Sequence, residues 1–323
     1  MSSALHCRVD KERGETVGGA TAPRHLALVG PTASAKSALA MEMARCDPSI
    51  ELVSVDAMQV YRGMDIGTAK PSPVERAAVP HHLLDLADPC EDFSVARFQA
   101  EARAALAAIE ARGHRALLVG GTGLYVLALV DDLTLPGRYP EARAVAEAEA
   151  DTAALHRRLV ELDPVAAARM EPTNRRRLVR ALEVTVGSGR PFSSFGPGLD
   201  AYPPSPITQV GLRLPLELLD QRIAARLDSM VEAGFLDEVR RLAARPAGLS
   251  RTARQALGYR ELLAQVAGEC LLDEAVDEAK LRTRRFARRQ LRWFRRDPRI
   301  TWHEAGGNPL ALAPHLLGDW APR

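Results

Sequence analysis

Short apolar runs alternate with amphipathic stretches over the first third of the chain. The apolar runs predict buried strands over residues 25–30, 51–55 and 115–119. Helical periodicity follows over 37–45 and over 95–112, where Ser94 is the expected N-cap and Gly113 the expected stop. The intervening stretch 62–90 is rich in Gly and Pro and predicts a loop. Strands alternating with helices predict a parallel α/β sheet with helices on both faces.

The second half of the chain changes pattern. Residues 138–189 are rich in Ala, Arg, Glu and Leu without strand signals and predict helices, whereas 187–206 contain four Gly and five Pro and predict a loop. A returning strand is expected over 207–214, followed by helices over 215–233, 235–245 and 274–296. We therefore expect a flexible N-terminal extension (1–24), an α/β core (25–137 and 207–323) and a helical insertion (138–206).

Bulk composition narrows the class of protein. The 323 residues are 46% hydrophobic and 26% charged, as in ordinary globular proteins. No apolar run reaches the roughly 18 residues that span a bilayer, and residues 1–24 lack a signal peptide, so we expect a cytoplasmic protein without membrane contact. The four cysteines are far apart and predict free thiols rather than a zinc site. The net charge is only +2, yet ten of the twenty residues from Lys280 to Arg299 are basic.

The segment that follows the first predicted strand carries the clearest chemical signal. Gly30-Pro-Thr-Ala-Ser-Ala-Lys-Ser37 approximates the pattern G-x-x-x-x-G-K-[ST], with Ala35 in place of the second glycine. In such loops, backbone N–H groups surround a phosphate at a helix N-terminus. Lys36 would add a positive charge and Ser37 a hydroxyl for Mg²⁺. The sequence therefore predicts a P-loop NTPase-like fold.

Two further segments end predicted strands and so belong at the same edge of the sheet, where ligands bind. Asp56 follows the second strand, and it either caps the next turn or acts as a general base. Gly120-Gly121-Thr122 ends the third strand where many nucleotide hydrolases and kinases carry an acidic Mg²⁺ ligand. The missing acid argues against ATP hydrolysis.

Arginines are arranged at helical spacing in three places. Arg222 and Arg226 share one face of a predicted helix, where they either pair with acids such as Asp220 or clamp a diphosphate. Residues 175–180 and the helix over 274–296 carry two more arginine clusters, the second with interleaved aromatic residues. Such clusters are often solvated faces, but two of them beside a phosphate loop favour a nucleic-acid partner.

Several motifs occurring in order over about residues 25–303 resemble the tRNA dimethylallyltransferases. They are Gly30–Ser37, the long segment Ser54–Pro71, Leu118–Tyr125, Asp163–Arg169, Arg180–Val184 and Gly258–Arg260. The resemblance implies transfer of a prenyl group from dimethylallyl diphosphate to N6 of the adenine 3′ of the anticodon (position 37 of tRNA). An adenine in a stacked loop must be extruded for this chemistry. The implied partners are the tRNA anticodon stem-loop and dimethylallyl diphosphate, with Mg²⁺ as cofactor and a monomeric enzyme.

The resemblance also implies roles for individual residues. Asp56 would accept a proton from the adenine amino group, Thr32 would donate to the departing diphosphate, and Arg226, with Arg222 as the alternative, would stabilise its charge. The implied diphosphate-binding residues are Gly30, Pro31, Thr32, Ala33, Ser34, Ala35, Lys36 and Ser37, the last also binding Mg²⁺. The implied tRNA-binding residues are Asp56, Ala57, Met58, Gln59, Thr122, Arg143, Arg176, Arg177, Arg180, Gln255, Gly258, Tyr259 and Arg260.

Two positions depart from the family pattern, and two other functions remain open. The family usually has Gly at position 35 and Ser at position 57, whereas this chain has Ala35 and Ala57. A left-handed Ala35 would cost about 1–2 kcal/mol, and we expect the loop to tolerate its methyl group. The alternatives to prenyl transfer are a P-loop nucleotide or small-molecule kinase and an RNA-binding protein without catalysis.

Overall fold

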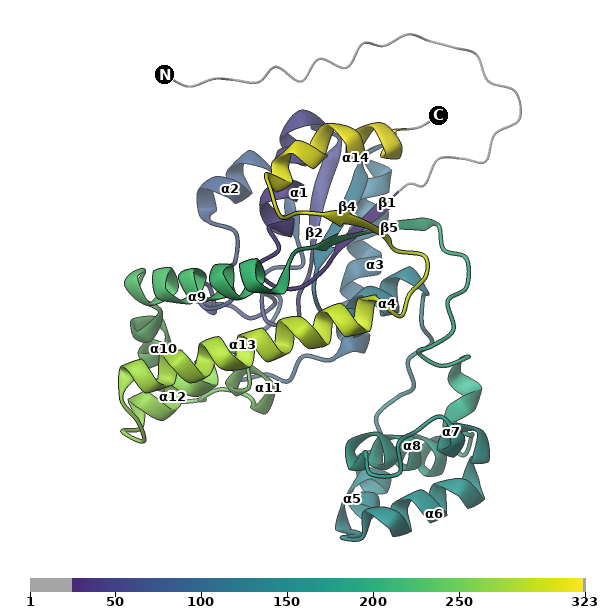
Figure 1. Cartoon of the computed structure of the whole chain (residues 1–323). Coiled ribbons are helices and arrows are strands. Elements are labelled where there is room, and N and C mark those ends of the chain that lie inside the picture. Colours follow the sequence, from purple (N-terminus) through teal and green to yellow (C-terminus); the bar gives the residue numbers. More distant parts are fainter. Residues whose placement is uncertain (1–24, 322–323) are drawn as a thin grey trace, which may run out of the picture. The chain divides into compact units, whose positions relative to one another are not determined.

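The computed structural model describes residues 25–321 (Figure 1). The predicted extension over 1–24 lies outside the described residues. The described chain divides into two compact units, one formed by residues 25–130 and 204–321 and the other by Asp131–Pro203.

The larger unit is built on a six-stranded sheet whose paired strands are all parallel, in the order β3-β2-β4-β1-β5-β6. The strands are β1 (His25–Val29), β2 (Ile50–Val55), β3 (His81–His82), β4 (Arg115–Gly120), β5 (Ile207–Arg213) and β6 (Thr301–Glu304). Val29 and Val55 both pair with Gly120. The strands β1, β2 and β4 therefore end level with one another, which brings the segments that follow them together. The predicted P-loop-like α/β fold is confirmed.

Helices cover both faces of this sheet, as the alternation of buried side chains requires. The helices of the larger unit are α1 (Lys36–Cys46), α2 (Pro73–Ala78), α3 (Val95–Ala111), α4 (Gly123–Val130), α9 (Leu216–Glu232), α10 (Phe235–Ala243), α11 (Arg251–Arg254), α12 (Tyr259–Val266), α13 (Leu272–Phe294) and α14 (Ala313–Trp320). Leu26 and Leu28 of β1 pack in one cluster with α1 and α14, whereas Ala27 and Val29 pack in the other with α3 and α4.

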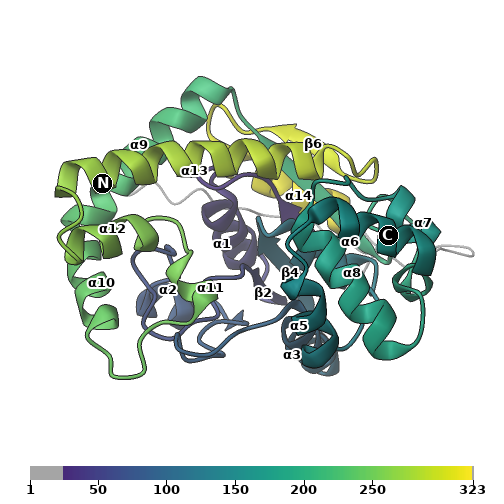
Figure 2. The same cartoon turned by 90° about the horizontal axis from the view of Figure 1, so that it is seen from below.

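Two long helices, α9 and α13, run antiparallel to each other beside the sheet (Figures 1 and 2). Their direction follows from two ion pairs at opposite ends of the contact. Lys280 Nζ lies 2.6 Å from Asp228, and Arg288 donates two hydrogen bonds to Asp220, the shorter being 2.7 Å. Asp220 therefore pairs with Arg288 of α13.

The smaller unit is helical, with a core of its own. It contains α5 (Pro140–Ala148), α6 (Thr152–Leu162), α7 (Pro164–Ala168), α8 (Arg175–Ser188) and a short 3₁₀ turn over Phe192–Phe195. Buried Leu155, Leu159, Leu178 and Leu182 hold α6 against α8. The buried Asp163 caps α7 through the N–H of Ala166 and also accepts from Ser193.

The structure corrects the expected element boundaries in several places. Residues 62–90 are not all loop, because Ser72 and Glu75 form a capping box that starts the short helix α2. The two-residue strand β3 follows it, and β6 pairs with β5 at the other edge of the sheet. The hydrophobic pattern also did not predict α4, α11, α12 and α14. All of these elements are short, and short segments carry too few periods to be recognised.

Candidate active site

The Gly30–Ser37 loop joins β1 to α1 at the level carboxyl ends of the strands. Gly30 has a φ of 145°, and a Cβ there would lie 2.6 Å from the carbonyl oxygen of Leu212, so the position requires glycine. Ala35 is the N-cap of α1 with a φ of 66°, in the left-handed region. Ala33 is left-handed as well, with a φ of 61°. The loop therefore keeps a glycine-type backbone at two alanines, at a cost of about 1–2 kcal/mol each.

Lys36 is buried inside this loop, with 8% of its surface exposed. Its ammonium group donates to the carbonyl oxygen of Pro31 at 2.5 Å and to Ser34 Oγ at 3.3 Å. Burial, together with the nearby charge of Arg226, lowers the pKa of Lys36 to about 7, while Asp56 acts in the opposite sense. The lysine, Arg226 and Asp56 therefore act on one another electrostatically.

Thr32 links the loop to α9. Arg226 Nη1 donates to Thr32 Oγ1 at 3.2 Å. Burial lowers the pKa of Arg226, and the carboxylate of Asp56 opposes that shift. The side chain of Arg222, one turn earlier on α9, makes no hydrogen bond or ion pair to any described residue. Of the two candidate arginines, the structure brings Arg226 to the loop.

Asp56 follows β2, and one of its carboxylate oxygens caps the next turn. Oδ1 accepts the N–H groups of Met58 at 2.7 Å and Gln59 at 3.3 Å. Oδ2 accepts no hydrogen bond from the described residues. The next residue, Ala57, donates its N–H to Thr122 Oγ1 at 3.2 Å, which ties this segment to the end of β4. Asp56 therefore caps the next turn, as one of its two interpretations predicted, but it uses only Oδ1 to do so. Its Oδ2 is not used by the cap.

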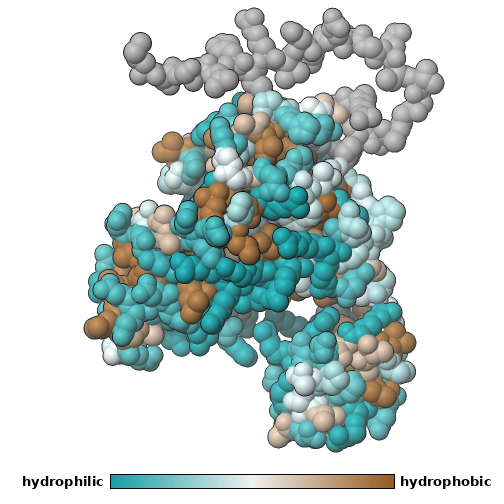
Figure 3. All heavy atoms as spheres, in the orientation of Figure 1, coloured by the Kyte–Doolittle hydropathy of each residue, from teal (hydrophilic) through white to brown (hydrophobic). Residues whose placement is uncertain are grey.

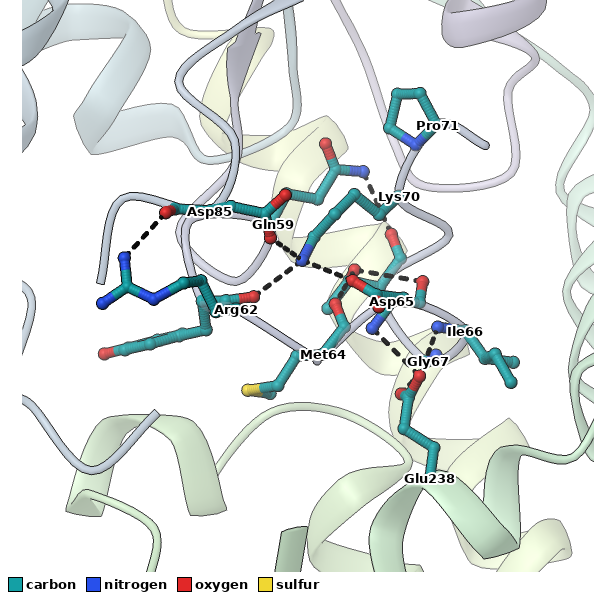
Figure 4. A network of polar contacts seen from close by, with 12 residues as sticks. Gln59, Arg62, Met64, Asp65, Ile66, Gly67, Lys70, Pro71, Asp85 and Glu238 are labelled. Atoms are coloured by element: carbon teal, nitrogen blue, oxygen red, sulfur yellow. Dashed lines mark hydrogen bonds and ion pairs between the residues drawn. The ribbon is translucent and has the colours of Figure 1, made fainter. Parts of the chain in front are cut away.

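A polar network holds the segment after Asp56 in place (Figure 4). Gln59 Nε2 donates to the carbonyl oxygens of Thr68 at 3.1 Å and Ala69 at 3.2 Å. The fully buried ammonium of Lys70 contacts Asp65 and Asp85 at 2.6 and 2.7 Å. These two carboxylates neutralise the charge of Lys70.

Glu238 of α10 completes this network from the other side. Its buried carboxylate accepts the N–H groups of Asp65, Ile66 and Gly67 at 3.0, 2.8 and 3.3 Å, and the hydroxyl of Tyr259 at 2.5 Å. Burial beside Glu238 raises the pKa of Tyr259 far above its ordinary value. Sequence reasoning missed Glu238 because a single glutamate on an amphipathic helix resembles any solvated acid.

The predicted tRNA-binding residues of the larger unit differ in exposure, and five of them are half-buried: Asp56, Ala57, Met58, Gln59 and Thr122. Gln255 and Arg260 are exposed, but Tyr259 is completely buried. Gly258 is also buried, and a Cβ there would lie 2.6 Å from the ring of Phe235. The side chain of Tyr259 therefore supports the network around Glu238 and reaches no surface in this structure.

In the smaller unit, the predicted residues lie on or near α8. Arg176 and Arg177 are exposed and make no side-chain hydrogen bond or ion pair to the described residues. Arg180 and Arg143 both contact the buried Glu183, at 2.7 and 3.4 Å, and sequence reasoning had assigned no role to that glutamate. Glu183 therefore fixes two of the arginines, while Arg176 and Arg177 stay free for an anionic partner.

The arginine-rich helix α13 is exposed along one side, and hydrophilic side chains cover the face where it runs (Figure 3). Arg288 is neutralised by Asp220, and Arg282 pairs with Glu278 and Glu261. The exposed arginines of α13 and the turn after it are Arg285, Arg289, Arg292, Arg295 and Arg296. The opposite side of α13 is buried and carries Gln290, which contacts the Gly30–Ser37 loop.

Ser37 is the predicted metal ligand of this site. No cluster of three or more His, Cys, Asp or Glu side chains within residues 25–321 is suited to hold a metal. Ser37 is exposed in the first turn of α1, and its hydroxyl bonds to no described residue. Mg²⁺ commonly binds through one or two protein groups together with substrate phosphates and water. Ser37 fits such a shared site.

The sheet, with a phosphate-type loop after its central strand β1, defines a P-loop-like α/β protein. The sequence model of the IPP transferase family matches residues 59–297. The chain is 52% identical to a tRNA dimethylallyltransferase from Kineococcus radiotolerans, covering 90% of this chain and 95% of that protein. It is 50% identical to one from Streptomyces coelicolor, covering 91% and 95%. The chain belongs to the IPP transferase family, which includes these tRNA dimethylallyltransferases.

Solved structures agree with this assignment. A tRNA isopentenylpyrophosphate transferase from Bacillus halodurans is 38% identical, with a TM-score of 0.67, covering 92% of this chain and 97% of that one. A eukaryotic dimethylallyltransferase acting on tRNA is 25% identical, with a TM-score of 0.74, covering 90% and 76%. Within the described residues, no helix is both long and apolar enough to span a bilayer.

Proposed function

We propose that this protein transfers the dimethylallyl group of dimethylallyl diphosphate to N6 of adenine 37 in tRNA and releases diphosphate. The observation that carries the proposal is the meeting of opposite charges at one sheet edge. Lys36 and Arg226 stand at the Gly30–Ser37 loop, and the carboxylate of Asp56 acts on both. Family membership supports the same reaction. The two cationic side chains suit the leaving diphosphate, and the carboxylate suits the amino nucleophile.

In the proposed reaction these groups act on the nucleophile and on the leaving group. N6 forms a bond to C1 of the prenyl group as the C1–O bond breaks, and the electron pair of that bond leaves with the diphosphate. The N6 proton passes to the free Oδ2 of Asp56. Thr32 donates to the departing oxygens, and Lys36 and Arg226 stabilise the charge that develops there. Ser37 would hold a Mg²⁺ ion that neutralises the diphosphate further.

The surface of the protein offers places for tRNA phosphates. Arg176 and Arg177 on the smaller unit and Arg260 on the larger unit are exposed, and α13 adds several more arginines. Phosphate contacts of this kind fix position without reading sequence. We propose that they bind the anticodon stem-loop, and that the protein acts as a monomer in the cytoplasm.

The experiment incubates the protein with unmodified tRNA, Mg²⁺ and either dimethylallyl diphosphate or ATP, and then measures the masses of the digested nucleosides. We expect one five-carbon unit on adenosine with dimethylallyl diphosphate and no change with ATP. Phosphate transfer from ATP, or tRNA binding without any product, would overturn the proposal in favour of a kinase or an RNA-binding protein.

Asp56→Asn tests the assignment of the base. The amide keeps an oxygen that can cap Met58 and Gln59 but cannot take the proton from N6. We expect turnover to fall by at least about 100-fold, the usual scale for losing a general base, while tRNA affinity stays within twofold. Unchanged turnover would remove Asp56 from the proton transfer.

A further inference from the structure

Gln290 is a buried polar residue that the proposed chemistry does not use. It lies on the inner side of α13 and is 6% exposed. Its amide makes two hydrogen bonds to main-chain groups far away in the sequence. Oε1 accepts the N–H of Thr32 at 2.9 Å, and Nε2 donates to the carbonyl oxygen of Gly121 at 2.8 Å. One side chain therefore bridges the Gly30–Ser37 loop and the segment that follows β4.

The backbone around Gly121 is shaped for this side chain. A Cβ at Gly121 would lie 2.3 Å from Gln290 Nε2, and a Cβ at Gly123 would lie 2.2 Å from the ring of Trp293. Gln290 and Trp293 are three residues apart and so share one face of α13. The two glycines thus let α13 approach the end of β4 closely.

Each end of the bridge leads directly to a group of the proposed reaction. At one end is Thr32, whose hydroxyl oxygen also accepts from Arg226. At the other end, Gly121 precedes Thr122, whose Oγ1 accepts the N–H of Ala57, next to Asp56. The leaving-group side and the nucleophile side of the site are therefore connected through one amide.

We propose that Gln290 is a positioning residue that fixes the spacing between the diphosphate-binding Thr32 and the Asp56 segment. It touches neither substrate, and it acts through Thr32 and Gly121. A misplacement of about 1 Å between reacting groups can cost on the order of 100-fold in rate, so such a spacer matters to catalysis. This inference rests on the proposed function for the identity of the substrates, but diphosphate binding tests it separately.

The test is a double-mutant cycle with Gln290→Met, Thr32→Ala and the double variant. Methionine nearly preserves side-chain volume but makes neither hydrogen bond. We expect Q290M to weaken diphosphate binding about tenfold by calorimetry and to lower kcat/KM for dimethylallyl diphosphate by at least as much, with tRNA affinity within twofold. Because Gln290 acts through Thr32, the double variant should bind diphosphate within twofold of T32A. Multiplicative losses would overturn the proposal.

Gln99→Met is the matched control. Gln99 is also a buried glutamine on a helix, 5% exposed, and its Nε2 donates to the carbonyl oxygen of Ala128 at 2.8 Å. We expect Q99M to leave diphosphate affinity and kcat within twofold of the parent protein. If Q99M and Q290M lose the same amount, Gln290 is merely structural and the proposal fails.

A second variant keeps the test decisive if Q290M does not fold. Gln290→Asn retains the amide but shortens the side chain by one methylene, so it cannot reach Thr32 and Gly121 together. We expect the same tenfold loss of diphosphate affinity, and wild-type affinity in a folded Q290N protein would overturn the spacing argument. If the parent protein binds diphosphate but prenylates no tRNA, the proposed function fails. The calorimetric cycle still tests whether Gln290 acts on diphosphate binding through Thr32.

Discussion

Diphosphate binding to the Gly30–Ser37 loop should take up a proton at mildly alkaline pH. The ammonium of Lys36 is buried, and its pKa lies at about 7 rather than at the ordinary 10.5. Burial is the main cause, and the charge of Arg226 adds to it. A bound diphosphate brings negative charge beside the amine and favours its protonated form. The pKa of Lys36 must therefore rise when the anion binds.

The size of the effect follows from the pKa of the free protein. At pH 8, an amine with a pKa of about 7 is ~90% neutral, so each binding event takes up about 0.9 proton through Lys36. At pH 6 the same group is already ~90% protonated, and the uptake falls to about 0.1 proton. The apparent Kd for diphosphate should accordingly rise about tenfold per pH unit above 7, until the pH reaches the pKa of the complex.

Calorimetry in two buffers with different enthalpies of ionisation measures this uptake. The dependence of the observed enthalpy on the buffer gives the number of protons exchanged at each pH. Lys36→Arg serves as the control because a guanidinium stays charged throughout this range. The protonation of diphosphate itself cancels in the difference between the two proteins. We expect a difference of about 0.9 proton at pH 8 and about 0.1 at pH 6. Equal uptake at pH 8 would refute the assignment of a neutral Lys36.

Two further predictions concern stability. Ala35→Gly should raise the free energy of unfolding by about 0.5–1 kcal/mol, because relief of the left-handed strain exceeds the added freedom of the unfolded glycine; a lower melting temperature would contradict this. Arg112, with His82 and His114, lowers the pKa of Glu51 to about 2 from 4.5. That carboxylate therefore stabilises the fold above pH 4.5 and loses its contribution as pH falls toward 2. Glu51→Gln should cost about 3 kcal/mol at pH 6 in urea unfolding, and this gap should close in acid. A pH-independent gap would exclude the ion pair as its cause.

The sequence predicted the parts of this protein that repeat a local pattern. The strands 25–30, 51–55 and 115–119 and the helix capped by Ser94 were all recognisable, because apolar runs and caps are short-range signals. The meeting of Asp56 with the Gly30–Ser37 loop also followed, since parallel strands end at one edge of a sheet. The two-residue β3 and the edge strand β6 did not, because their pairing depends on neighbours far along the chain.

The residues that support the site could not be predicted from the sequence, because their contacts are far apart along the chain. Gln290 contacts Thr32 across 258 positions, and Glu238 contacts Asp65 across 173. In the sequence, Gln290 lies within an arginine-rich run that resembles a solvated face. Such residues support the site only because they are buried, and their burial is set by the fold rather than by the local sequence. The motif has glycine at position 35, so the sequence predicted a strained backbone at Ala35 only if the alanine kept the left-handed conformation of that glycine.

The Gly30–Ser37 loop combines two kinds of unfavourable feature, backbone strain and a buried charge. Ala33 and Ala35 have left-handed backbones, and the ammonium of Lys36 is buried with its pKa lowered to about 7. Each of these features costs stability in the free protein, and an anion in the loop would relieve the electrostatic part. By contrast, the buried carboxylates of Glu51 and Glu238 accept hydrogen bonds from their neighbours and so stabilise the fold. A strained form persists only where the surrounding structure holds it, and here Gln290 holds the loop through the N–H of Thr32. Under the proposed function, diphosphate would then meet a loop that is already ordered, and its binding energy would not be needed to order the protein.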